Sequence, residues 1–417
     1  MQLPERIYAA QQATQSGRLD EAARLWGNVL ELAPDHAQAL FHLGQYRLLQ
    51  KDAATAISLF ERAAKADPKA PAIPLNLAFA RRAAGDSAAE LTALDQALAL
   101  DPYYLPALLA KGAVLERLGQ MRQAARIYRH ALASAPPEEQ LPPELRKHLA
   151  SARAAVNRNA EELDRHLTPA LEAVRARWSE GSARFENCKE ALLGRKKIYP
   201  QQPTTLNFPE LPAIQFYPES EFAWLKNLEA ETDEIATELL QLVNADPDFV
   251  PYVQYPPGIP LNQWAELNHS PRWGAYFLWK DGNRQEKHCA ECPRTAKIVE
   301  RMPLATIPGY APAAFFSVLE PHTRIPPHTG VTNIRLIVHL PLVVPEECYF
   351  RVGNETRRVE RGRAWIFDDT IEHEAWNDSD KPRIILIFDI WNPLLTPMER
   401  ELATALLAGL ESYYSAG

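Results

Sequence analysis

Two histidines precede runs of β-forming residues in the last third of the chain. His328 opens the stretch PPHTGVTNIRLIVHL, and His373 follows AWIFDD and comes ten residues before Arg383. Two neutral imidazoles suit ferrous iron, and oxygen-activating iron sites usually add a carboxylate two residues after the first His. Gly330 occupies that position here. The pair therefore indicates either a metal site with one protein ligand missing or two ordinary loop histidines.

Charged side chains share strand faces with apolar ones in two of these runs. Because alternate side chains of a strand point to the same side, Arg335, Ile337 and His339 share one face of IRLIVHL. Arg383 and Asp389 likewise share a face of RIILIFDIW. A buried charge is costly unless a partner or a ligand pairs with it, so these faces predict an anionic ligand inside the domain. Arg383 could hold a carboxylate through two parallel hydrogen bonds, or could pair with Asp389 as a structural ion pair.

Six short β-type runs after residue 272 must position these side chains. They are WGAYFLW, AAFFSVL, IRLIVHLPLVV, CYFRV, AWIFDD and RIILIFDIW. Short strands separated by turn residues are typical of a β-sandwich or barrel, and nothing in the order of elements favours a doubly wound sheet. The two histidines are expected to flank the same sheet, each at a strand edge. Helices are expected at about 220–244 and 396–415, after a Pro-rich and irregular stretch at 198–221.

A different pattern fills the first third of the chain, where similar positions recur every 34 residues. Prolines recur at Pro34, Pro68, Pro102 and Pro136, helix-stopping positions at Gly17, Lys51, Gly85 and Gly119, and small residues at Gly44, Ala78 and Gly112. Pro cannot continue a helix, and Gly readily ends one. The period resembles that of the tetratricopeptide repeat, which predicts an all-α solenoid of about four repeats. An apolar helical stripe at 142–178 suits the cap that such an array needs.

Length and composition limit the classes of protein that this chain can represent. Its 417 residues predict two or three domains, and 46% hydrophobic with 24% charged residues are typical of a globular protein. A net charge of -8 argues against a dedicated nucleic-acid binder. The start of the sequence lacks a secretory signal, and no apolar run is long enough to span a membrane. The cytoplasm is therefore the expected location.

The four cysteines, at positions 188, 289, 292 and 348, are too few for a disulfide scaffold. Cys289 and Cys292 form HCAEC, which supplies at most half of a zinc site. Unpaired surface thiols are the default expectation for this pair. A redox or disulfide role near the entrance of the site is the alternative.

The motifs around the two histidines together resemble a known enzyme family. PPHTGVTNIRLIVHLPLVVP and GRAWIFDDTIEHEAWNDSDKPRIILIFDIWNP are similar to the aspartyl/asparaginyl β-hydroxylase family, over about residues 270–393 with a weaker extension from 200. The resemblance implies a double-stranded β-helix domain (jelly-roll or cupin-like) with flanking helices. The animal members also carry tetratricopeptide repeats before this domain. The predicted organisation is therefore repeats at 1–136, a helical cap and linker at 137–199, and the oxygenase domain at 200–417.

The same resemblance implies roles for individual residues. It points to a dioxygenase that depends on Fe(II) and 2-oxoglutarate and uses O2, with His328 and His373 as the metal ligands. Because the family has Gly in place of the third ligand, Gly330 implies a coordination position filled by water. The remaining implied roles are cosubstrate binding by Arg383, Ser317 and His339, with Arg383 on the far carboxylate, and substrate-carboxylate binding by Arg335.

Three further residues have two interpretations each. Trp279 either lines the substrate pocket or packs in the core. Asp368 and Asp369 either form the turn before EHE or supply a carboxylate to the metal. The turn is the preferred interpretation for the two acids.

The implied reaction is hydroxylation of Cβ of Asp or Asn in a peptide or protein, which the repeats could recruit. Animal members have a second Arg two residues after the first, and this chain has Ile337 there. Fewer positive charges then face the substrate, so the substrate could differ. Two alternatives therefore stay open: a repeat scaffold with a catalytically degenerate jelly roll, and a related oxygenase for a small molecule or an acyl chain.

Overall fold

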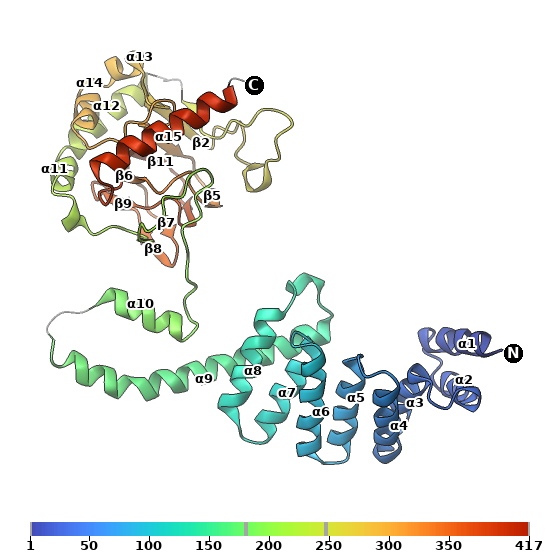
Figure 1. Ribbon diagram of the computed structural model, residues 1–417. Coiled ribbons are helices and arrows are strands. Elements are labelled where there is room, and N and C mark those ends of the chain that lie inside the picture. Colours follow the sequence, from blue (N-terminus) through green and yellow to red (C-terminus); the bar gives the residue numbers. More distant parts are fainter. Residues whose placement is uncertain (1, 179–181, 246–248, 416–417) are drawn as a thin grey trace. The chain divides into compact units, whose positions relative to one another are not determined.

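The chain forms two compact units, Met1–Gly194 and Arg195–Gly417 (Figure 1). The computed structural model describes residues 2–178, 182–245 and 249–415. The first unit is a helical solenoid of the tetratricopeptide type, and the second is rich in β-sheet. Among the described helices, none is both long and apolar enough to cross a membrane.

The solenoid is built from helices that pack in sequential pairs. They are α1 Leu3–Gln15, α2 Leu19–Leu32, α3 Ala37–Leu49, α4 Ala53–Ala66, α5 Ala72–Ala83, α6 Ser87–Leu100, α7 Leu105–Arg117 and α8 Met121–Ser134. The long helix α9 (Pro143–Arg175) packs on α8, as predicted for the cap, and α10 (Ala183–Leu192) follows it. Leu149 and Ala152 of α9 are fully buried in the same apolar cluster as Tyr128 of α8.

The recurring positions of the repeat have the physical roles that the sequence predicts. Each helix-stopping position has a left-handed backbone, with φ of 68° at Gly17, 61° at Lys51, 78° at Gly85 and 74° at Gly119. A Cβ on Gly44 would lie 2.7 Å from the ring of Phe60, so only a residue without a side chain allows α3 and α4 to approach this closely. The 34-residue spacing therefore reflects the same helix-pair geometry in each repeat.

The second unit contains two sheets. The larger has the order β1-β2-β4-β11-β6-β9 with β3 on β2, and the smaller has the order β5-β10-β7-β8. The strands are β1 Val250–Pro251, β2 Trp273–Lys280, β3 Asn283–Arg284, β4 Ala314–Leu319, β5 Thr323–His328, β6 Arg335–Val343, β7 Cys348–Val352, β8 Glu355–Arg358, β9 Trp365–Phe367, β10 His373–Asn377 and β11 Arg383–Trp391. All six predicted runs are strands.

The larger sheet separates two apolar layers. One face, with Leu336, Val338 and Leu340, packs against helices α11 (Leu225–Ala230), α12 (Thr232–Asn244) and α14 (Pro293–Glu300). The opposite face contributes Trp273, Leu319 and Trp365 to a second cluster that is shared with Phe350 and Ala375 of the smaller sheet. The alternation along β6 therefore directs Arg335, Ile337 and His339 into the space between the sheets, as the sequence predicted.

Two details of the predicted elements need correction. The helix expected at about 220–244 is two helices, α11 and α12, which are separated at Glu231. His328 and His373 lie at strand ends of one sheet, as expected, but their strands are β5 and β10 of the smaller sheet, which were not predicted. The prolines in TRIPPH concealed β5, because Pro cannot donate a ladder hydrogen bond and weakens any strand assignment. The last helix, α15 (Pro397–Ser415), agrees with the predicted range.

Candidate functional site

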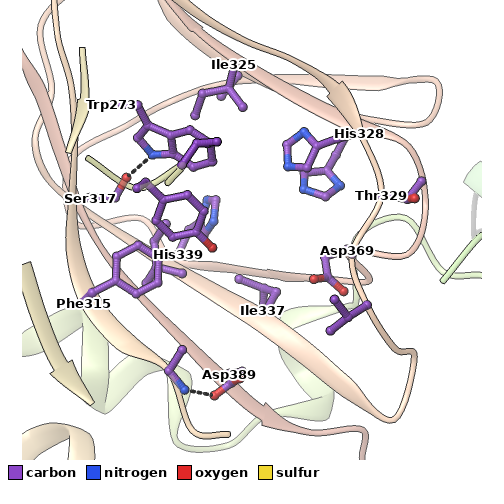
Figure 2. Close-up of a pocket in the computed structure, with 18 of the residues that line it drawn as sticks. Trp273, Phe315, Ser317, Ile325, His328, Thr329, Ile337, His339, Asp369 and Asp389 are labelled. Atoms are coloured by element: carbon purple, nitrogen blue, oxygen red, sulfur yellow. Dashed lines mark hydrogen bonds between the residues drawn. The ribbon is translucent and has the colours of Figure 1, made fainter. Parts of the chain in front are cut away.

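His328 and His373 are brought together by the pairing of two neighbouring strands. His328 ends β5, His373 begins β10, and the antiparallel register places the two residues directly opposite one another. The centroids of their rings are 4.0 Å apart, and both rings line a cavity of about 430 Å³ between the sheets. Figure 2 shows Trp273 and Ser317 across this cavity from His328 and Asp369.

Backbone carbonyls fix the orientation of both imidazoles. Nδ1 of His328 lies 2.8 Å from the carbonyl oxygen of Pro326, and Nδ1 of His373 lies 3.0 Å from that of Ile371. Each Nδ1–H donates to its carbonyl, and in this tautomer Nε2 carries the lone pair that a metal needs. Burial lowers the pKa of His328 and brings that of His373 well below its ordinary value, so both rings are neutral at pH 7. The donor pair therefore fits a divalent metal such as Fe(II).

No third protein ligand completes this pair among the described residues. They contain no group of three or more His, Cys, Asp or Glu side chains arranged to hold a metal. Gly330 leaves the usual carboxylate position without a side chain, and the carboxylate of Asp369 fills the space where a Cβ would be. The backbone N–H of Gly330 also donates to the carbonyl oxygen of Asp369, at 2.6 Å. Asp369 is thus held beside the pair, and burial raises its pKa to about 7.

The two neighbouring acids have different roles. Asp368 forms the turn, because its Oδ1 accepts from the backbone N–H of Thr370 at 2.9 Å and from its hydroxyl at 2.6 Å. Asp369 faces the cavity instead, and its Oδ1 has no hydrogen-bond partner among the described residues. The turn interpretation therefore holds for both acids, and only the side chain of Asp369 faces the cavity.

Gly330→Ala is expected to lower the free energy of unfolding by about 1–3 kcal/mol, the usual cost of overpacking a filled site. The new methyl group would overlap the Asp369 carboxylate, which would have to move from its place in the cavity wall. Urea denaturation of the metal-free protein measures this change. Gly409→Ala is the matched control, since nothing lies within 4 Å of its Cβ position. Equal stability of Gly330→Ala and the wild type would contradict the packing described here.

Arg383 is a buried cation without an anionic partner. Its side chain is 2% exposed, it lines the same cavity, and it forms no salt bridge with any described residue. Its Nε has no hydrogen-bond partner among the described residues, and burial lowers the pKa of its guanidinium to about 10. A guanidinium at this pKa is still charged at pH 7. Its burial without a counter-charge is costly, which indicates that a bound anion completes the site.

Two neighbours of Arg383 supply further polar atoms to the cavity. His339 is buried, its Nδ1 has no partner among the described residues, and burial together with Arg383 brings its pKa well below the ordinary value. Ser317 Oγ accepts from Trp273 Nε1 at 3.1 Å, so its own hydroxyl hydrogen remains available to a ligand. Unpartnered atoms of Arg383, His339, Arg335 and Asp369 meet in this one cavity. Such a concentration suits a ligand that carries carboxylates.

Asp389, near the end of β11, pairs with Arg335 and not with Arg383, which was its candidate partner in the sequence. Asp389 Oδ2 accepts a hydrogen bond from Arg335 Nη1, and its Oδ1 accepts from the backbone N–H of Ala313 at 2.9 Å. Asp389 therefore neutralises Arg335 and leaves Arg383 available. The register explains this choice, because Trp391 lies opposite Arg335 on the adjacent strands and brings Asp389 within reach.

Trp279 does not line the cavity. A β-bulge between Phe277 and Trp279 shifts the register of β2 against β4, so that Trp279 lies opposite Ala314. Both residues belong to the apolar layer under the helices. The core interpretation of Trp279 is therefore correct, and its assignment to substrate binding was wrong. Simple alternation from Trp273 would have placed it in the cavity, and no residue of the run WGAYFLW marks the bulge.

Cys289 and Cys292 are neither surface thiols nor part of the entrance to the cavity. Both are buried in the layer under the helices, where Cys289 Sγ donates to the carbonyl oxygen of Leu278 at 3.3 Å. Burial raises the pKa of both thiols, which keeps them protonated and unreactive.

An aromatic wall that the sequence did not reveal covers one side of the cavity. The ring of Tyr252 stacks on Trp273 at 4.2 Å between centroids, and Trp264 meets His328 edge to face at 4.9 Å. Tyr252 and Trp264 lie in the Pro-rich segment before β2, which has no hydrophobic period from which a pocket role could be recognised.

Comparisons with known proteins match each unit separately. Residues 229–393 match the family model described as Aspartyl/Asparaginyl beta-hydroxylase, and residues 9–71 match a Tetratricopeptide repeat model. The aspartyl/asparaginyl beta-hydroxylase of Homo sapiens is 40% identical over 151 residues, which are 36% of this chain and 20% of that protein. This chain thus matches about a fifth of the length of that relative.

A second relative and a solved structure extend these matches. The ornithine lipid ester-linked acyl 2-hydroxylase of Rhizobium tropici is 31% identical over 195 residues, which are 46% of this chain and 66% of that protein. The crystal structure of MamA protein matches at 19% identity with a TM-score of 0.33, and covers 43% of this chain and 97% of that one. The two named hydroxylases thus act on different kinds of substrate.

Proposed function

Because this chain carries an aspartyl/asparaginyl β-hydroxylase domain behind tetratricopeptide repeats, we propose that it is an Fe(II)- and 2-oxoglutarate-dependent oxygenase. The observation that carries the proposal is the content of one cavity. Two neutral, paired histidines meet there with a buried guanidinium that has no counter-charge in the described part of the chain. A metal chelated by 2-oxoglutarate would bind the two histidines, and the cosubstrate would give the guanidinium a carboxylate partner.

Each residue has a defined task in this proposal. His328 and His373 hold the metal through Nε2, and the carbonyls of Pro326 and Ile371 keep both rings in the required tautomer. Arg383 pairs with the far carboxylate of 2-oxoglutarate. His339 and the Ser317 hydroxyl add hydrogen bonds to the same cosubstrate.

A bound metal and 2-oxoglutarate would supply the oxidation that converts a substrate C–H bond to C–OH, with O2 as the oxidant and with succinate and CO2 as coproducts. The chain itself orients these groups and excludes water. Trp264 packs against His328, and Tyr252 covers Trp273 on the other side of the cavity, so these rings limit the solvent in the cavity. Asp369 lies beside the histidine pair and can accept hydrogen bonds from water there.

The repeats give the protein a surface for protein partners, and we assign to them the recruitment of a protein that acts with the hydroxylase domain. The family resemblance names Cβ of Asp or Asn in a peptide as the target carbon. The printed name of the Rhizobium tropici relative instead gives an acyl chain as that enzyme's substrate.

Anaerobic titration of the full chain with Fe(II) and then 2-oxoglutarate tests the proposal. We expect a weak visible charge-transfer band that appears only when both are present, because the band requires the cosubstrate to chelate the metal. Succinate instead of 2-oxoglutarate is the control, since it lacks the keto group. A protein that retains no iron and shows no band would make the scaffold alternative the better description.

A further inference from the structure

We infer that the carbon hydroxylated in this cavity belongs to an uncharged hydrocarbon group, which comes from an acyl chain or an aliphatic side chain and not from an acidic one. The inference rests on the proposed function, and it concerns only which substrate the same site accepts. Three features of the cavity support it: a neutralised Arg335, an apolar Ile337 and an uncharged entrance.

The first feature is that no cation remains for a substrate carboxylate. Of the described residues lining the cavity, Arg335 and Arg383 are the only Arg or Lys. Arg383 is assigned to the cosubstrate, and Arg335 is paired with Asp389, whose side chain is only 1% exposed. Asp389 is fixed further by the N–H of Ala313 at 2.9 Å. An acidic substrate would therefore have to displace Asp389 from Arg335, although the Asp389 carboxylate is buried and accepts two hydrogen bonds.

The second feature is the apolar surface around Ile337. Ile337 points into the cavity from β6, between Arg335 and His339 of the same face. Phe315 of β4 and Ile387 of β11 line the same space, and Tyr252 stacks on Phe315 at 5.3 Å between ring centroids. In Figure 2, Ile337 lies between His339 and Asp369 on the wall of the cavity. A carboxylate placed on this surface would lose its water without gaining a positively charged partner.

The third feature is the segment at the entrance. Residues 249–265 contain no charged side chain. Val253, Gln254 and Tyr255 of this segment line the cavity, while Tyr255 and the nearby Ile259 are 39% and 47% exposed. Uncharged side chains therefore line this side of the cavity, which favours an uncharged chain over a charged one.

Three probes test this inference on the full chain loaded with Fe(II) and 2-oxoglutarate. They are N-dodecanoyl ethanolamine, a pentapeptide with a central Leu, and the same pentapeptide with a central Asp. We expect kcat/KM for at least one hydrocarbon probe to be about tenfold or more above kcat/KM for the Asp peptide. A site lined by apolar groups leaves a charged side chain unpaired. The two hydrocarbon probes distinguish an acyl chain from a peptide side chain. Hydroxylation of the Asp peptide alone would overturn the inference while leaving the proposed function intact.

A binding measurement separates failure of the inference from failure of the proposed function. Calorimetric titration of the metal-free protein with the same probes should rank them in the same order. Binding of a hydrocarbon probe without any turnover would support the inferred substrate class and count against the oxygenase. Failure of both hydrocarbon probes to bind would overturn the inference.

Two variants change the charge of the cavity wall that would face the substrate. Ile337→Arg adds a cation to the cavity, and Asp389→Asn frees the existing Arg335 without changing the size of residue 389. Each should shift the preference toward the Asp peptide by about tenfold or more, since each provides a partner for a carboxylate. Ile198→Arg, at a site that is 77% exposed and outside the cavity, is the matched control. An unchanged preference in folded Asp389→Asn would contradict the role given to its pair with Arg335.

Discussion

The affinity of His373→Ala for iron should be more than about 100-fold lower than that of the wild type. Even the loss of a residue that only orients a metal ligand lowers metal affinity about 10–100-fold. The effect is large since no third His, Cys, Asp or Glu side chain of the described residues joins the two imidazoles in a metal-binding group. The register of β5 and β10 gives His328→Ala the same expected result. Iron content after anaerobic loading and desalting measures the loss.

His322→Ala is the control for this experiment. His322 lies in the same PHT triplet pattern as His328, but it is exposed and contacts Asp380 at 2.9 Å outside the cavity. Its removal should leave the iron content unchanged. Full iron retention by His373→Ala would show that the metal is held elsewhere, and the proposed site would have to be abandoned.

Arg383→Met should weaken 2-oxoglutarate binding by about 30-fold to 4,000-fold, since truncating one partner of a buried charge pair costs about 2–5 kcal/mol. The same change should leave the ligand-free protein equally stable or more stable. In that state the guanidinium is buried without a counter-charge, and Met replaces it with an apolar side chain of similar length. Titration with 2-oxoglutarate and urea denaturation measure the two effects.

The opposite signs of these two effects make the prediction specific. A purely structural Arg383 would lose stability when replaced, with or without the cosubstrate. Arg324→Met is the control, because Arg324 lies on β5 with its side chain 60% exposed and pairs with Glu374 outside the cavity. It should alter neither measurement markedly.

Much of the candidate site could be predicted because its residues lie on strands of simple alternation. Arg335, Ile337 and His339 share a face of β6 in the structure as they do in the sequence pattern. The two histidines were recognisable from their motifs, although their strands were not. Trp279 shows where alternation fails, since one bulge in β2 moves it from the cavity to the opposite layer. Bulges depend on the partner strand, which a single run of residues does not contain.

By itself, the sequence determined the helix-pair repeat and the six main strands, and it pointed to His328, His373 and Arg383 as candidates to hold a metal and an anion. Those features follow from local periods and from residue chemistry. Only the tertiary structure decided which charges neutralise one another. Asp389 and Arg335 are 54 positions apart, and Asp369 fills the space beside Gly330 from a separate turn. Such pairings arise from strand register across the sheets, which fixes long-range distances that spacing along the chain leaves open.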